Sequence, residues 1–127
     1  MCDVKFYRCK HCGNLVGMIH ASGVPIICCG EPMELIQANS AEASLEKHIP
    51  AVEVEGDRVN VKVGSLPHPM LPEHHIAWVY LQTEKGGQRK CLEVGAAPET
   101  CFALSCGDKP VAVYAYCNLH GLWVKQL

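Results

Sequence analysis

The sequence lacks the features of a membrane protein or a nucleic-acid-binding protein. No stretch approaches the run of about 18 apolar residues that a bilayer-spanning helix requires. The formal net charge of −2 leaves no broad basic field for nucleic acid or for an anionic membrane surface. Residues 1–10 carry charges and have none of the apolar core of a secretory signal. We therefore expect a cytoplasmic protein that binds neither nucleic acid nor membranes.

The chain also lacks an internal repeat, a low-complexity tract and a helical period in its longer C-terminal part. Residues 51–55 and 58–63 alternate valine with polar side chains, which is typical of strands with one buried face. Gly56-Asp57 between them favours a hairpin, and Gly86-Gly87 predicts a second turn. Further strand-like runs lie at 75–83, 86–94, 99–104, 111–117 and 122–127. About seven short strands predict an all-β fold, an antiparallel β-sandwich of immunoglobulin-like architecture.

The first third of the chain has a different character, because short apolar stretches there alternate with clusters of cysteine. A segment of under about 40 residues rarely buries enough surface to fold without a staple. Residues 37–48 are polar and rich in alanine and serine, which indicates a linker or a short helical turn. We predict a small metal domain at 1–36 and a sandwich domain at 37–127.

Nine cysteines are many for 127 residues, and their odd number means that intramolecular disulfides cannot use them all. Cys9 and Cys12 form a CxxC pair, and Cys28-Cys29 supplies two more thiols after 15 intervening residues. Four thiolates around one ion make a tetrahedral site for zinc or iron, and the spacing does not choose between these metals. Gly13 and Gly30 follow the two pairs and permit tight turns.

A second candidate metal site combines four histidines and one cysteine from distant segments. Prolines surround the first three of them, which favours stiff extended loops over helix. Neighbouring side chains of an extended segment point to opposite sides, so only one of His74 and His75 can face a metal, and we choose His74. The five predicted ligands are His48, His68, His74, Cys117 and His120. Five such donors exceed the usual demand of tetrahedral zinc and suit a five-coordinate iron with one open position.

The sequence resembles the desulfoferrodoxins along its whole length. The motifs that carry this resemblance are the CxxC and CC pairs, EKHIP at 46–50, HPMLPEH at 68–74 and CNLHGLW at 117–123. The family implies a desulforedoxin-like iron domain, followed by a domain whose iron has four equatorial histidines and Cys117 as its axial ligand. It also implies superoxide reductase activity, the one-electron reduction of superoxide to hydrogen peroxide.

The resemblance further assigns roles to two residues beside His48. Lys47 is expected to attract superoxide and orient a proton-donating water, and Glu46 is expected to cap the oxidised iron. Ferrous iron with one thiolate and neutral imidazoles has a net charge of about +1, which also favours an anionic substrate. The family implies rubredoxin or a flavoprotein reductase as electron donor, and a homodimer.

Three other functions compete with this interpretation. A non-enzymatic zinc-ribbon protein with an interaction sandwich would need only the N-terminal cysteines. An iron electron carrier would differ by having no open coordination position at the second iron. A zinc hydrolase would need a general base such as Glu46 or Glu73, but Cys117 would occupy the position that hydrolases keep for water.

We assign Cys91, Cys101 and Cys106 to core packing or incidental thiols, and Trp123 to the core.

Overall fold

The computed structural model describes residues 2–41 and 48–127, and these residues form strands and turns with no helix. The predicted all-β class is therefore confirmed. The chain divides into two compact units, one of residues Cys2–Gln37 and one that contains Ala38–Leu127. No helix in the described part of the chain is long and apolar enough to cross a membrane.

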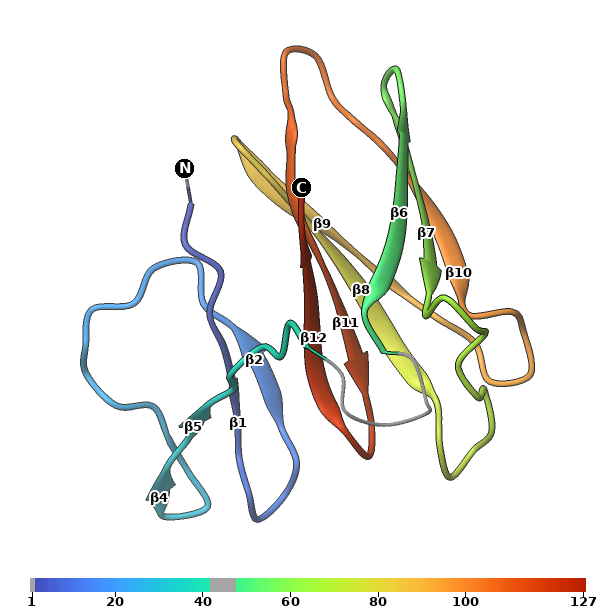
Figure 1. The fold of residues 1–127 in the computed structure, drawn as a ribbon. Coiled ribbons are helices and arrows are strands. Elements are labelled where there is room, and N and C mark those ends of the chain that lie inside the picture. Colours follow the sequence, from blue (N-terminus) through green and yellow to red (C-terminus); the bar gives the residue numbers. More distant parts are fainter. Residues whose placement is uncertain (1, 42–47) are drawn as a thin grey trace. The chain divides into compact units, whose positions relative to one another are not determined.

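The N-terminal unit consists of very short strands (Figure 1). A three-stranded antiparallel sheet has the order β2-β1-β5, and β3 pairs with β4 in a separate ribbon. The bounds are β1 Phe6–Arg8, β2 Leu15–Gly17, β3 Ile27–Cys28, β4 Glu31–Pro32 and β5 Glu34–Leu35. Among the described residues of this unit, only Cys9 and Met33 are buried apolar side chains. So small a core needs an additional constraint to stay folded.

The C-terminal unit is built from two antiparallel sheets that pack face to face (Figure 1). One sheet has three strands in the order β10-β7-β6, and the other has four in the order β12-β11-β8-β9. The bounds are β6 Pro50–Glu55, β7 Arg58–Val63, β8 Ile76–Thr83, β9 Gly86–Cys91, β10 Glu99–Ala103, β11 Pro110–Cys117 and β12 Gly121–Gln126. The seven strands follow the runs that the sequence predicted.

Alternating valines supply one wall of the core. Val59, Val61 and Val63 of β7 are almost fully buried, while the residues between them are exposed or half-buried. Residues of the other sheet face them, among them Leu81 of β8 and Val113 of β11. The period-two pattern therefore marks the buried face of β7 correctly, because successive side chains of a strand point to opposite sides.

The turn between β8 and β9 differs from the prediction. Thr83 pairs with Gly86, so the chain reverses at Glu84-Lys85 and both glycines lie inside β9. The Gly86-Gly87 turn prediction was wrong. A Cβ atom at Gly87 would collide with the ring of Tyr80 and approach the Leu81 carbonyl oxygen to 2.9 Å. Glycine is needed here for a close approach within the sheet, which is its other common use in strands.

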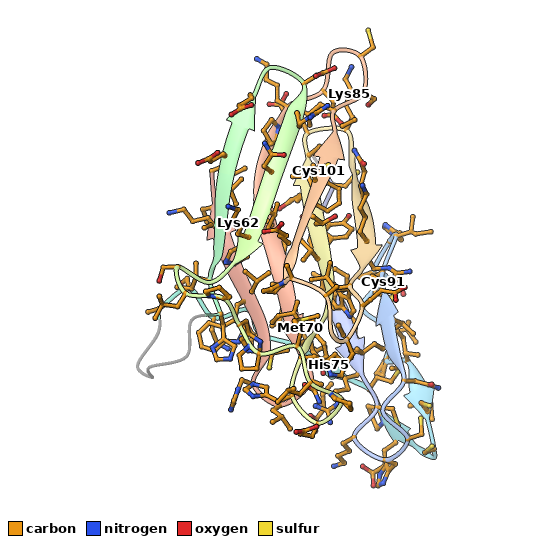
Figure 2. The ribbon with its side chains drawn as sticks, turned by 90° about the vertical axis from the view of Figure 1, so that its right-hand side faces the viewer. Lys62, Met70, His75, Lys85, Cys91 and Cys101 are labelled. Carbon is orange, nitrogen blue, oxygen red and sulfur yellow. The ribbon has the colours of Figure 1, made fainter. Side chains whose placement is uncertain are left out.

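Several connections meet at one end of the sandwich. Met70 and His75 lie at this end, and Lys85 lies at the opposite end (Figure 2). β7 and β11 end here, and β6, β8 and β12 begin here, because neighbouring strands are antiparallel. Residues 48–49, the loop 64–75 and the turn 118–120 are consequently brought together.

Candidate metal centres

The first candidate centre lies at two tight turns of the N-terminal unit. Cys9 and Cys12 flank the turn after β1, and Cys28 and Cys29 stand at the turn after β3. One sulfur from each of the four lies within 4.8 Å of the others. Cys29 has a left-handed backbone with φ of 52°. The structure thus brings together all four cysteines that the sequence singled out.

The sulfur positions fit one tetrahedral metal ion. Sulfurs bonded at about 2.3 Å to such an ion lie about 3.8 Å apart, and Cys12 Sγ and Cys28 Sγ are 3.6 Å apart. The backbone N–H of Cys12 donates to Cys9 Sγ at 3.5 Å, and the side-chain amide of Asn14 donates to Cys28 Sγ at 3.7 Å. Such donors stabilise thiolate ligands from outside the coordination shell.

Three thiols of this cluster have shifted pKa values, in opposite directions. The backbone N–H of Cys12 lowers the pKa of Cys9 to about 6. Hydrogen bonds with the Cys12 and Cys9 side chains raise the pKa of Cys28 and raise that of Cys29 to about 12. Four adjacent sulfurs cannot all carry negative charge without a cation, so the cluster has the electrostatic character of a cation site.

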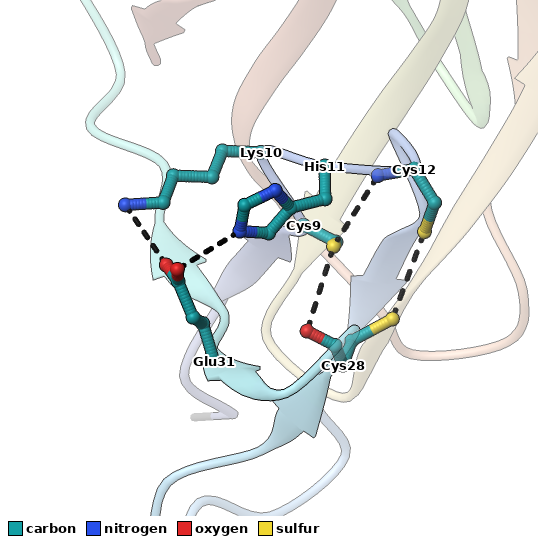
Figure 3. A network of polar contacts seen from close by, with 6 residues as sticks. All are labelled: Cys9, Lys10, His11, Cys12, Cys28 and Glu31. Atoms are coloured by element: carbon teal, nitrogen blue, oxygen red, sulfur yellow. Dashed lines mark hydrogen bonds and ion pairs between the residues drawn. The ribbon is translucent and has the colours of Figure 1, made fainter.

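A carboxylate ties the two halves of this centre together (Figure 3). Glu31, which follows the second cysteine pair, lies 3.0 Å from Lys10 Nζ and 3.1 Å from His11 Nε2. Lys10 is the first cause of the lowered pKa of Glu31. Sequence reasoning missed this role of His11. All three side chains are about half exposed, so these ion pairs add little to stability.

The second candidate centre lies at the crowded end of the sandwich. His48 precedes β6, His68 and His74 belong to the loop 64–75, Cys117 ends β11, and His120 lies in the next turn. One ligand atom from each of the five lies within 4.8 Å of the others. Residues up to 72 positions apart in the sequence are therefore neighbours here.

The four imidazoles form a closed ring of neighbours. Successive centroids are 4.7 Å apart from His48 to His68, 4.7 Å from His68 to His74, 5.0 Å from His74 to His120, and 4.9 Å from His120 to His48. Each ring is tilted or edge-on to the next, with interplanar angles of 59° to 82°. This arrangement matches four ligands placed around one ion in a square.

The distances between ligand atoms fit a metal. Donors about 2.1 Å from one centre lie about 3 Å apart when adjacent and about 4 Å apart when opposite. His48 Nε2 and His120 Nδ1 are 3.1 Å apart, and Cys117 Sγ is 3.8 Å from His120 Nδ1. Cys117 is fully buried and belongs to the apolar core cluster, whereas His120 is exposed. The sulfur thus approaches from the core, and His120 is the member of the four-histidine ring that reaches solvent.

Residues around the four histidines hold individual imidazoles in place. His68 Nδ1 is 2.8 Å from the Pro69 carbonyl oxygen, an outer contact of the kind that sets the tautomer of a ligand histidine. Trp123 stacks on His48 and donates from Nε1 to the His120 carbonyl oxygen. Trp123 was predicted to lie in the core, and its place beside the histidines was not foreseen, although LW directly follows the CNLHG motif.

Other predicted residues have different outcomes. His75 lies outside the cluster, and its Nδ1 is 2.9 Å from the Leu71 carbonyl oxygen. Lys47 and Glu46 fall within 42–47, outside the described residues. Three cysteines were assigned to core packing or incidental thiols, and their exposure on the sandwich excludes core packing and agrees with incidental thiols: Cys91, Cys101 and Cys106.

Comparisons with known proteins agree with this arrangement. A sequence model of desulfoferrodoxin matches residues 40–126, and a model of the desulfoferrodoxin N-terminal domain matches residues 3–36. Desulfoferrodoxin of Syntrophotalea carbinolica is 43% identical over 97% of this chain and 96% of its own length. Desulfoferrodoxin of Nitratidesulfovibrio vulgaris is also 43% identical, over 94% of this chain and 93% of its own.

A solved structure extends the likeness to three dimensions. The superoxide reductase from Treponema pallidum superposes with a TM-score of 0.86, at 41% sequence identity, and the match covers 99% of this chain and 100% of that one. Both the small N-terminal unit and the sandwich are included in matches of this extent. The chain belongs to the desulfoferrodoxin family.

Proposed function

We propose that this protein is a superoxide reductase with one iron at each of its two centres. The observation that carries the proposal is the ring of four imidazoles with the Cys117 thiol on its core side. The Treponema pallidum protein, which matches over nearly the full chain, is a superoxide reductase. Its likeness supports the same activity here.

The reaction adds one electron and two protons to superoxide and gives hydrogen peroxide. Iron in the second centre supplies the electron when it is bound. His48, His68, His74 and His120 contribute no charge when neutral, and the Cys117 thiolate contributes one negative charge. A ferrous site of this composition keeps a charge of about +1, which attracts superoxide locally although the whole chain carries −2.

The donor set favours iron over zinc at the second centre. Five protein donors exceed the four that zinc usually takes, and zinc has no redox chemistry with which to reduce superoxide. At the first centre four thiolates suit either metal, and we assign iron there by family likeness. We propose that this first iron mainly holds the small unit together.

Two residues next to His48 complete the proposal. Lys47 would attract superoxide and orient a water molecule for proton delivery, and Glu46 would supply a carboxylate for the oxidised iron. Replacing Lys47 with alanine is expected to lower the second-order rate constant for superoxide by about tenfold or more and to weaken its dependence on ionic strength. Glu46→Ala should leave that rate constant near the wild-type value. An unchanged ionic-strength dependence in Lys47→Ala would remove the steering role.

Turnover requires an external reductant, and rubredoxin or a flavoprotein reductase would restore ferrous iron. We further propose a homodimer and a cytoplasmic location. Light scattering on the purified protein tests the dimer, and reduction of the oxidised protein by each donor, followed in the visible absorption, tests the choice of donor.

The deciding experiment uses anaerobically purified full-length protein. Metal analysis should give about two irons per chain, and superoxide should oxidise the second centre while hydrogen peroxide accumulates without release of dioxygen. Release of dioxygen together with peroxide would indicate a dismutase. A colourless protein containing zinc after growth in iron would support the structural zinc alternative instead.

A further inference from the structure

The side chain of Asn118 bridges the two peptide groups on either side of His74. Asn118 Oδ1 accepts a hydrogen bond from the backbone N–H of His75 at 2.8 Å, and Asn118 Nδ2 donates to the Glu73 carbonyl oxygen at 3.0 Å. The backbone N–H of Asn118 also donates to the His75 carbonyl oxygen at 3.1 Å. One residue of the β11–β12 turn thus holds the backbone around His74 through three hydrogen bonds.

The loop that carries His74 is anchored before the last turn, since His68 N–H donates to the Val63 carbonyl oxygen and Gly95 N–H donates to the Met70 carbonyl oxygen. It connects β7 to β8 through residues 64–75, outside the named strands. Leu71 and His74 exchange two backbone hydrogen bonds of 2.9 and 3.1 Å, which close a tight turn. The side-chain hydrogen bonds of Asn118 join that turn to the β11–β12 turn.

The turn that carries Asn118 is anchored by the sheet. Cys117 is the last residue of β11 and pairs with both Ile76 of β8 and Gly121 of β12. Cys117 and His120, two members of the cluster, lie in or beside this turn. Asn118 therefore connects the turn that carries His74 to the turn beside Cys117 and His120.

We propose that Asn118 is a positioning residue, which sets the direction of the His74 imidazole and thereby the affinity and symmetry of the second metal centre. This inference rests on the proposed function, since it takes the five-residue cluster as a metal site. Asn118 itself is exposed, so its hydrogen bonds compete with water and contribute modestly to folding. Its effect is expected on the metal rather than on the stability of the fold.

The test compares three variants in the full-length protein. Asn118→Ala removes both side-chain bonds, and Asn118→Asp keeps the acceptor for His75 N–H but places an oxygen against the Glu73 carbonyl. Leu119→Ala, at an exposed neighbour in the same turn, is the matched control. The metal-free proteins are titrated with Fe²⁺ under anaerobic conditions, and iron at each centre is then removed by a competing chelator.

The four-cysteine centre of the same molecule provides an internal reference. In Asn118→Ala the affinity of the second centre for Fe²⁺ should fall by about 10- to 100-fold, the usual effect of losing an outer-shell partner. Its absorption and electron paramagnetic resonance spectra after oxidation should also change. Asn118→Asp should lose less Fe²⁺ affinity at the second centre, and Leu119→Ala should match the wild type. The four-cysteine centre should bind Fe²⁺ with wild-type affinity in all three variants.

Three other results have distinct meanings. Wild-type affinity and spectra in Asn118→Ala would overturn the positioning role and leave the proposed function standing. A lower unfolding temperature of the metal-free variant, with unchanged affinity and spectra, would also overturn it, because the role would then be structural. Failure of the wild-type cluster to bind Fe²⁺ would instead overturn the proposed function.

Discussion

The indole of Trp123 lies parallel to the imidazole of His48, with ring centroids 4.5 Å apart and an interplanar angle of 13°. Trp123 Nε1 also donates a hydrogen bond of 3.1 Å to the His120 carbonyl oxygen. One side chain thus contacts two members of the proposed iron site. The second tryptophan, Trp78, stacks instead on Tyr116.

This geometry predicts that metal binding at the second centre quenches the fluorescence of Trp123. Titration of the metal-free protein with Co²⁺ should reduce the emission of the wild type, and the reduction should be much smaller in Trp123→Phe. Phenylalanine can still stack on His48 but cannot donate to His120, so we also expect an affinity about tenfold lower. Trp78→Phe serves as control and should retain the quenching. Equal quenching in both variants would contradict the prediction.

Separate substitutions should uncouple the two centres. Cys117→Ser removes the sulfur ligand of the second centre, so its sulfur-to-iron absorption band should disappear. Losing an outer-shell partner costs up to about 100-fold, and losing a ligand should cost more, so we expect superoxide reduction to fall by more than about 100-fold. Cys9→Ser should remove the first iron and leave the activity largely intact. Loss of turnover in Cys9→Ser while the second iron is still bound would show that the first centre takes part in catalysis.

Metal binding at the four-cysteine centre should become tighter as pH rises. The pKa values of Cys28 and Cys29 are raised, the latter to about 12, so both thiols carry protons at neutral pH and must lose them to bind a metal. Cys9, with a pKa of about 6, loses its proton first. Calorimetric titration with Zn²⁺ in buffers of different ionisation enthalpy should show release of more than about one proton per ion at pH 7. The Cys9→Ser variant measures the protons released at the histidine centre alone. Equal proton release from this variant and the wild type would show that the four-cysteine centre does not release these protons.

Asp108 should make the stability of the sandwich dependent on pH in the acid range. Its carboxylate accepts hydrogen bonds from the Thr83 hydroxyl and from the backbone N–H groups of Lys85 and Lys109, and these lower its pKa below the ordinary 3.8. The folded protein therefore binds a proton less readily than the unfolded chain, and the stabilisation is present above about pH 4 and lost as pH falls below it. In Asp108→Asn the denaturation midpoint should change less between pH 7 and pH 3 than in the wild type. Asp57→Asn, at an exposed hairpin position, is the control and should keep the wild-type pH dependence.

Phe102 should be among the most sensitive core positions. It is 1% exposed and belongs to the apolar cluster between the sheets, so Phe102→Ala removes a buried ring and leaves a cavity. We expect a loss of about 3 to 5 kcal/mol in the free energy of unfolding, measured by urea denaturation. Val54→Ala, on the exposed side of β6, should cost under about 0.5 kcal/mol. Similar costs for the two substitutions would mean that the sandwich core is not packed as described.

The sequence alone predicted the features that depend on local pattern. The alternation of valine with polar residues along β7 identified its buried face, because the period of a strand is a local property. The CxxC spacing and the adjacent cysteines identified the four sulfurs that lie together. The same alternation separated His74 from its neighbour His75, and family motifs named the remaining members of the histidine ring.

Only the tertiary structure decided how these residues are arranged around each other. The order of the imidazoles in the ring, the burial of Cys117 and the contacts of Trp123 and Asn118 depend on segments up to 75 positions apart, as His48 and Trp123 are. Local sequence preferences carry no information on such pairs, since strand pairing across the sandwich sets their distance. The same holds for Gly87. The sequence shows the glycine, but the Tyr80 ring that leaves no room for a side chain there belongs to the neighbouring strand β8.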